Sequence, residues 1–216
     1  MTTRKSVLAM LSSNVALGNS TIHFILYTLF FCSGCSALIY QVMWQRMLFT
    51  VFGVDLVSIT IIVSVFMFGL GMGGLLGGKL ADRMPTRLLA LYVVIELYIA
   101  MFGFVSPALI DFLGDMLFTN SEVITAIASF VILAVPTFLM GATFPILVIH
   151  VNRYNQNIGE SVGGLYFANT MGGAMGAYLS GFVLLSSMGV GDAINRAAVL
   201  NLLIAVVALV VFRRQN

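Results

Sequence analysis

Charged side chains are scarce in this sequence. Ten Lys and Arg and eight Asp and Glu make up only 8% of its 216 residues, against about 25% in ordinary soluble domains. Apolar residues reach 60% and the mean hydropathy is +1.07. A water-soluble surface cannot be built from so few charges, so the composition predicts a protein that lies in a membrane.

Metal ligands and redox groups are equally rare, with two cysteines and two histidines. Cys32 and Cys35 form a C-x-x-C, nominally a redox motif, but thiol exchange needs a thiolate, which an apolar environment disfavours. His23 and His150 are isolated and make no metal site. We expect no metal, no cofactor and no catalytic residues. The basic residues are dispersed, which does not favour nucleic-acid binding.

Long apolar runs fill most of the chain. Each of six runs meets or nearly meets the roughly 20 residues that a helix needs to cross about 30 Å of hydrocarbon. The runs lie at about 24–44, 56–78, 88–110, 123–149, 162–187 and 193–212. The predicted fold class is therefore all-α: a polytopic membrane helix bundle with six transmembrane helices, in a domain that covers residues 23–212.

The two ends of the chain are assigned to the cytoplasm. Residues 7–17 are apolar but too short to span, so residues 1–22 are predicted to form a cytoplasmic segment with a short interfacial helix. Basic residues set membrane orientation. With the N-terminus inside, eight of the ten lie on the cytoplasmic side, and residues 213–216 form a basic cytoplasmic tail. These eight are Arg4, Lys5, Lys79, Arg83, Arg87, Arg153, Arg213 and Arg214.

The second apolar run contains a G-x-G-x-x-G at Gly69, Gly71 and Gly74. A dinucleotide-binding loop needs a preceding strand and a water-accessible helix N-terminus, and neither is expected inside a membrane span. Spacing by four instead predicts small-xxx-small faces that let helices approach closely. The residues predicted to pack in this way are Gly69, Gly73 and Gly77 in the second run and Gly172 and Gly176 in the fifth.

The residues after these glycines, GGKLADRMPTR, place four charged side chains between the second and third spans. They resemble the G-x-x-x-D-R-x-G-R type loop of major facilitator transporters, although Pro85 and Thr86 stand where that loop usually has Gly-Arg. The alternative is a solvated connection that obeys the positive-inside rule. The four residues are Lys79, Asp82, Arg83 and Arg87.

Four blocks, in order, carry a wider resemblance. They are SGCSALIYQVMWQRML (33–48), the glycine-rich second span, PTFLMGATFPILV (136–148) and GGLYFANTMGGAMGAYLSGFVLL (163–185). Together they resemble the membrane domain of the fused major facilitator/spermidine synthase family, whose members typically continue into a soluble aminopropyltransferase-like domain. The resemblance implies half of a major facilitator fold and a bacterial inner membrane. Gln41 departs from it, since members commonly carry an acid there.

This resemblance leads to a function and an alternative. A spermidine synthase domain needs a nucleoside-binding loop and an acidic base, and no soluble segment here exceeds about 20 residues. We therefore expect a chain that is not an enzyme on its own, and that anchors or serves a soluble synthase-like protein. The alternative is a small half-facilitator that transports polyamines or other organic cations as a homodimer. A membrane-embedded enzyme ranks last, because no catalytic constellation is present.

Glu96 is the one formally charged residue in the middle of a predicted span. An unpaired carboxylate there costs several kcal/mol, so such residues are candidates for function. One hypothesis is a substrate cavity for a cation or amine, lined by residues at similar depth; the other is a protonated group that hydrogen bonds between helices. The cavity residues are Glu96, Thr143, Tyr166, Asn169 and Thr170.

Polar residues also gather at the outer end of the first span. Gln41 lies one turn before Gln45 and Arg46, and all three lie beside Tyr40 and Trp44. The aromatic residues are typical of a membrane interface. Arg46 either gates an outward-facing cavity or anchors the helix at the interface.

Overall fold

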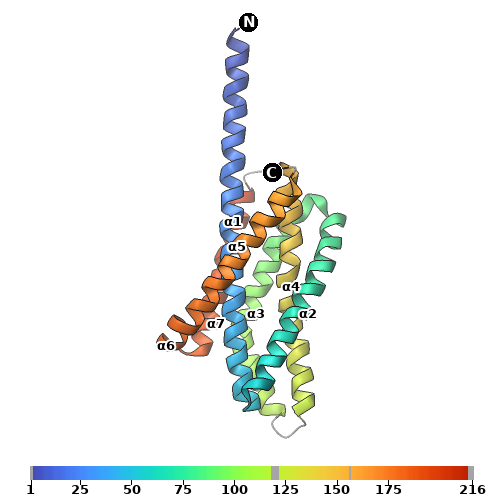
Figure 1. Cartoon of the computed structure of the whole chain (residues 1–216), viewed down its shortest axis with the longest axis vertical. Coiled ribbons are helices and arrows are strands. Elements are labelled where there is room, and N and C mark those ends of the chain that lie inside the picture. The colour runs from blue at the N-terminus through green and yellow to red at the C-terminus, as the bar shows by residue number, and fades with distance from the viewer. Residues whose placement is uncertain (1, 118–121, 156, 214–216) are drawn as a thin grey trace.

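The protein is described by a computed structural model over residues 2–117, 122–155 and 157–213, with side chains over 23–54, 56–115, 123–153 and 157–211. All regular structure in these residues is helical (Figure 1). The helices are α1 (Thr2–Phe52), α2 (Asp55–Arg83), η1 (Pro85–Arg87), α3 (Leu88–Leu117), α4 (Glu122–Asn155), α5 (Ile158–Leu179), η2 (Ser180–Leu184), α6 (Leu185–Ser187) and α7 (Val190–Arg213).

Local sequence explains where the helices end. Gly53 has a φ of 68° between α1 and α2, a left-handed conformation that glycine adopts without steric cost. Pro85 follows α2 and opens the short helix η1, because proline fits the first turn of a helix but not its interior. Asn157 caps α5, where its Oδ1 accepts a hydrogen bond of 3.2 Å from the backbone N–H of Glu160.

Five helical segments of the described chain are long and apolar enough to cross a membrane by length and composition. They match five of the six predicted spans, and are His23–Phe52, Leu56–Arg83, Pro85–Asp115, Val123–Arg153 and Val190–Val211. The predicted fifth span corresponds to α5, η2 and α6, which do not meet the same criterion. Glycines and polar residues such as Glu160 and Asn169 lower the hydropathy of α5, so its crossing stays a prediction.

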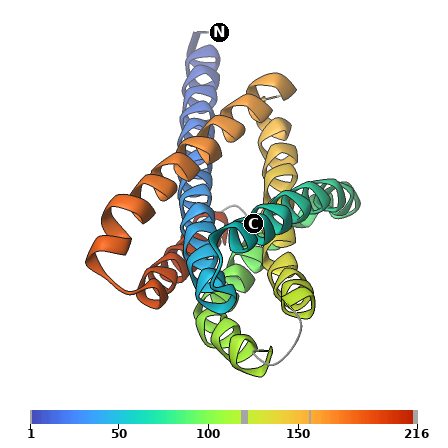
Figure 2. The same cartoon turned by 60° about the horizontal axis from the view of Figure 1, so that its bottom comes forward.

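The long helices pack mainly in pairs. α2 packs against α4, α1 against α5, and α3 against α7. Figures 1 and 2 show α2 and α5 on opposite sides of the bundle, each inclined to the central helices. α7 ends at the side of the bundle from which α1 projects.

The glycine stripe of α2 faces α4. Each of its three glycines is buried, and a Cβ atom added to any of them would collide with α4. At Gly73 the collision is with the backbone carbonyl of Phe138, and at Gly77 the nearest atom is the Cα of Ala142, at 2.6 Å. At Gly69 the obstacle is the side chain of Thr137. The close distance between α2 and α4 therefore depends on the absence of side chains at these three positions.

The stripe on α5 faces α1 in the same way. A Cβ atom at Gly172 would meet the carbonyl of Phe31, and one at Gly176 the carbonyl of Cys35. The two stripes thus pack against different helices of the same chain. A homodimer would have to use other surfaces.

Two predicted boundaries need correction or qualification. Lys79, Asp82 and Arg83 lie in the last turns of α2 rather than in a loop, because good helix formers continue the helix until Pro85. Residues 2–22 continue α1 as a single helix that projects beyond the bundle in Figure 1. Their side chains lie outside the described residues, as do residues 214–216 of the basic tail, so the interfacial placement is not tested.

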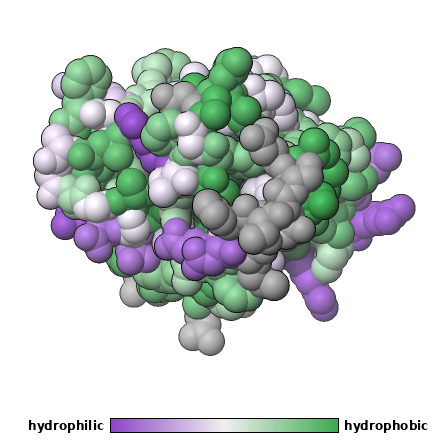
Figure 3. Space-filling view, turned by 90° about the horizontal axis from the view of Figure 1, so that it is seen from below, coloured by the Kyte–Doolittle hydropathy of each residue, from purple (hydrophilic) through white to green (hydrophobic). Residues whose placement is uncertain are grey.

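Apolar side chains cover much of the outside of the bundle as well as its core. Leu56, Met101 and Phe182 are each more than 60% exposed. Figure 3, a view of the end opposite the N-terminus, shows large apolar areas with hydrophilic side chains in separate patches. A surface of this kind suits lipid or a helical partner better than water.

Candidate functional site

The candidate site surrounds Glu96, in the middle of α3. The Glu96 side chain is fully buried, with 0% of its surface exposed. The Ser33 hydroxyl of α1 donates a hydrogen bond of 2.7 Å to Oε1, and Nδ2 of Asn201 on α7 donates one of 2.6 Å to Oε2. One carboxyl group thus joins three helices that are far apart in sequence.

Two tyrosines complete the surroundings of this carboxyl group. Tyr92, one turn before Glu96 on α3, and Tyr40 on α1 are both fully buried and within electrostatic range of Glu96. The Tyr40 hydroxyl and Oδ1 of Asn201 have no hydrogen-bond partner among the described residues, whereas the Tyr92 hydroxyl lies close enough to the Glu96 carboxyl group to interact with it. We name Glu96, Ser33, Asn201, Tyr92 and Tyr40 the carboxyl cluster.

Aromatic packing holds the cluster in place on its Tyr40 side. The Tyr40 ring stacks on Trp44 at 4.9 Å, and a Cβ atom at Gly103 of α3 would collide with the Tyr40 hydroxyl. The indole N–H of Trp44 donates a hydrogen bond of 2.9 Å to Ser106, also on α3. The rigid contact between α1 and α3 therefore fixes the position of Tyr40.

The structure gives the other predicted cavity residues different surroundings. Thr143 is buried but donates its hydroxyl to the Met140 carbonyl of its own helix, at 2.6 Å. Asn169 is half-buried against Gly34 of α1. Tyr166 is 63% exposed and contacts Phe144 edge-on at 6.5 Å, and Thr170 is exposed. Among the described residues no hydrogen bond joins Glu96 to these four, whose role in substrate binding stays a prediction.

Sequence reasoning did not name Ser33 and Asn201 as partners of Glu96. The sequence did contain one indication: Asn201 is the polar residue in an otherwise apolar run, AAVLNLLIAVV, and could have been proposed as a partner of Glu96. Depth along a span can be counted from sequence, but the direction in which a side chain points across the bundle depends on which helices are neighbours. That pairing of α3 with α7 is visible only in the fold.

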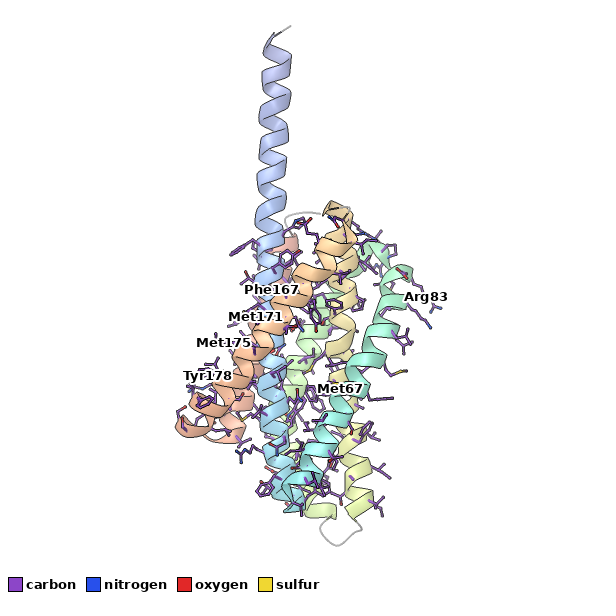
Figure 4. All side chains as sticks on the ribbon, viewed as in Figure 1. Met67, Arg83, Phe167, Met171, Met175 and Tyr178 are labelled. Carbon is purple, nitrogen blue, oxygen red and sulfur yellow. The ribbon has the colours of Figure 1, made fainter. Side chains whose placement is uncertain are left out.

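The outward face of α5 is rich in methionine and aromatic residues. Figure 4 shows Phe167, Met171, Met175 and Tyr178 along this helix, and each of them is more than 40% exposed. They alternate with the glycine face that packs on α1. Met67 lies on the exposed side of α2 in the same view.

The predicted outer-end residues lie between α1 and α2. The Gln45 amide donates a hydrogen bond of 3.3 Å to Ser58 of α2, Gln41 is half-buried and Arg46 is exposed. At the other end of the bundle Lys79, Asp82, Arg83 and Arg87 are all exposed. Arg83 extends from the end of α2 in Figure 4.

The chemistry open to the carboxyl cluster is binding rather than bond breaking. It holds a single carboxyl group with hydroxyls and an amide, and no nucleophile paired with a base. Over the described part of the chain, no group of three or more His, Cys, Asp and Glu could hold a metal ion. Oxygen acceptors around one buried acid suit a proton or another cation.

Comparison with known proteins finds one distant relative of interest. The chain is 23% identical over 178 residues to a polyamine aminopropyltransferase of Oceanobacillus iheyensis. The similarity covers 82% of this chain but 33% of that protein, so the chain spans about a third of its relative. No family model matches the chain, and no solved structure matches it. The protein is thus an all-helical bundle with distant similarity to a polyamine aminopropyltransferase.

Proposed function

We propose that this protein is embedded in the bacterial inner membrane with both termini in the cytoplasm, and that it anchors or serves a soluble aminopropyltransferase-like enzyme without being a catalyst itself. One observation carries the proposal. The similarity to an aminopropyltransferase covers 82% of a chain whose described residues are almost entirely helical. The similarity therefore lies in the helical bundle itself. It supports the proposal that this bundle works together with an aminopropyltransferase-like enzyme.

The cytoplasmic end of the bundle offers a surface for this partner. Lys79, Arg83 and Arg87 are exposed there. Arg153 ties α4 to the same region, since its guanidinium donates a hydrogen bond of 2.7 Å to the carbonyl of Pro85. Exposed basic side chains favour encounter with an acidic surface.

The test is purification of the tagged protein from its native membranes in mild detergent, followed by mass spectrometry of the proteins that remain bound in stoichiometric amount. We expect a soluble aminopropyltransferase-like protein. If the Arg83→Glu variant keeps an intact bundle but no longer retains this partner, the contact lies at the end of α2. Recovery of the bundle with no such partner would overturn the proposal.

A second candidate is a small half-facilitator that transports polyamines or other organic cations as a homodimer. The fully buried Glu96 favours it, because carboxyl groups inside membrane proteins often lie on substrate or proton paths. Uptake of labelled spermidine into liposomes would test this function, with Glu96→Gln as the control. Flux that is absent, or unchanged by the substitution, would reject it.

A further inference from the structure

One buried acceptor of the carboxyl cluster has no hydrogen-bond donor among the described residues. An ionised carboxylate only accepts hydrogen bonds, and both Glu96 oxygens already accept one, from Ser33 and Asn201. Oδ1 of Asn201 is an acceptor that lacks a donor, although Asn201 is 1% exposed. Buried acceptors of this kind are rare, because each costs the loss of its bond to water.

The cluster also lacks a positive charge. The titratable groups that interact with Glu96 are Tyr92 on its own helix and Tyr40 and Cys32 on α1; α7 contributes the neutral Asn201. No Lys, Arg or His within the described residues forms an ion pair with Glu96. An anion at this position in an apolar bundle would have no counter-charge.

We propose that Glu96 is a proton-binding site and that its carboxyl group is protonated at neutral pH. The reaction is the addition of one proton from the aqueous phase to one carboxylate oxygen, which removes the negative charge. The new O–H adds a donor to the cluster, in which Oδ1 of Asn201 is a buried acceptor without one. One proton therefore removes the unpaired charge and adds a hydrogen-bond donor to the cluster.

Packing favours a proton over a larger ligand. All five side chains of the cluster are buried. Glu96, Tyr92 and Tyr40 are fully buried, and no more than 8% of the surface of Ser33 or Asn201 is exposed. An organic ammonium ion would need space and a path between three packed helices, whereas a proton needs no volume of its own. The inference goes beyond the proposed function, since it requires neither a partner enzyme nor transport.

Proton release would affect the whole junction. The charged carboxylate would remain between α1, α3 and α7, and burial of an unpaired charge is costly enough to drive water entry or helix separation. Occupancy of the site by a proton thus links the contact of these three helices to pH.

The experiment uses the full chain in liposomes with dicyclohexylcarbodiimide, an apolar reagent to which the O–H of a protonated carboxyl group adds. Peptide mass spectrometry locates the adduct. We expect labelling of Glu96 at pH 7, and none of Asp82 or Asp192, whose side chains are exposed. Above the midpoint of titration, labelling should fall about tenfold per pH unit.

Two variants keep the result interpretable. Glu96→Gln resembles the protonated acid, because its amide both accepts and donates, so the variant should stay folded and lose the label. Asn201→Leu removes both the Nδ2 donor to Oε2 and the acceptor Oδ1, and should shift the pH midpoint of labelling, which a merely structural Asn201 would not do. An unshifted midpoint in folded Asn201→Leu would remove Asn201 from the site.

Competition separates a proton from other cations. Labelling is measured at constant pH with NaCl, choline chloride or spermidine at equal ionic strength. Equal labelling in all three supports the proton site. Protection by Na⁺ or by spermidine would overturn it in favour of a metal ion or an amine, and an unlabelled Glu96 between pH 5 and 8 would overturn it outright. Because purified protein is used, none of these results bears on the partner enzyme.

Discussion

The seam between α2 and α4 and the junction of α1, α3 and α7 hold helices together in opposite ways. At the seam, Gly73 and Gly77 contribute nothing but the absence of a side chain. At the junction, Glu96 contributes a side chain that reaches two other helices. The seam is therefore sensitive to an added atom, and the junction to a lost one.

Gly73→Leu should have the largest effect on this comparison. Its side chain would collide with the Phe138 backbone, which cannot move without displacing α4. Overpacking of a well-packed core costs about 1–3 kcal/mol and sometimes more, so we expect loss of a monodisperse species in detergent. Size-exclusion chromatography and thermal unfolding measure it.

Gly71 supplies the matched control for this substitution. It lies two residues earlier on the same helix, and a Cβ atom there meets nothing within 4 Å. Gly71→Leu should therefore leave the elution profile and the melting temperature unchanged. Equal damage from both substitutions would mean that the added bulk decides the outcome wherever it is placed on α2, because leucine is a better helix former than glycine at both positions.

The pair Glu96 and Asn201 should show the next largest effect. A double-mutant cycle with Glu96→Leu and Asn201→Leu measures their coupling free energy from unfolding in detergent, because Glu96→Leu removes the acceptor that Glu96→Gln would keep. Hydrogen bonds between membrane helices are worth about 0.6 to 2 kcal/mol, and we expect coupling in that range. Additive effects of the two substitutions would show that the hydrogen bond does not hold α3 to α7.

Ser106→Ala tests the second polar link of the junction. It would leave the buried N–H of Trp44 without its acceptor, which costs about 1 kcal/mol when the site relaxes partly. The melting temperature should fall by less than in Asn201→Leu. Ser106→Thr, which keeps the hydroxyl, should restore it, and a failure to do so would point to packing instead.

Arg153→Ala should have the smallest effect. Its hydrogen bond to Pro85 is exposed to solvent, and surface substitutions usually change stability by less than about 0.5 kcal/mol. We expect an unchanged melting temperature. A drop comparable with that of Ser106→Ala would show that the contact between the end of α4 and η1 is structural.

The sequence was informative about depth and spacing. Glycines at intervals of four predicted close helix contacts, and the cost of burying Glu96 predicted that this side chain lies inside. Both are properties of one helix and the solvent around it. Neither property tells which helix is the neighbour. Only the fold shows that Gly73 faces α4 and that Gly176 faces α1.

The same limit explains the candidate site. Asn169 and Asn201 are both amides in the second half of the chain, and depth favoured the first as the neighbour of Glu96. The observed partner is Asn201, because α3 packs on α7 and not on α5. The helix toward which a side chain points is decided by tertiary packing, and a local sequence pattern carries no information about that packing.

The single tryptophan gives the molecule a built-in optical probe. Trp44 is the one indole in the sequence, is fully buried, and stacks on a tyrosine of the carboxyl cluster. Its emission spectrum therefore arises from one known position and needs no added dye. Quenching or a red shift of that emission would report water reaching the contact between α1 and α3 in real time.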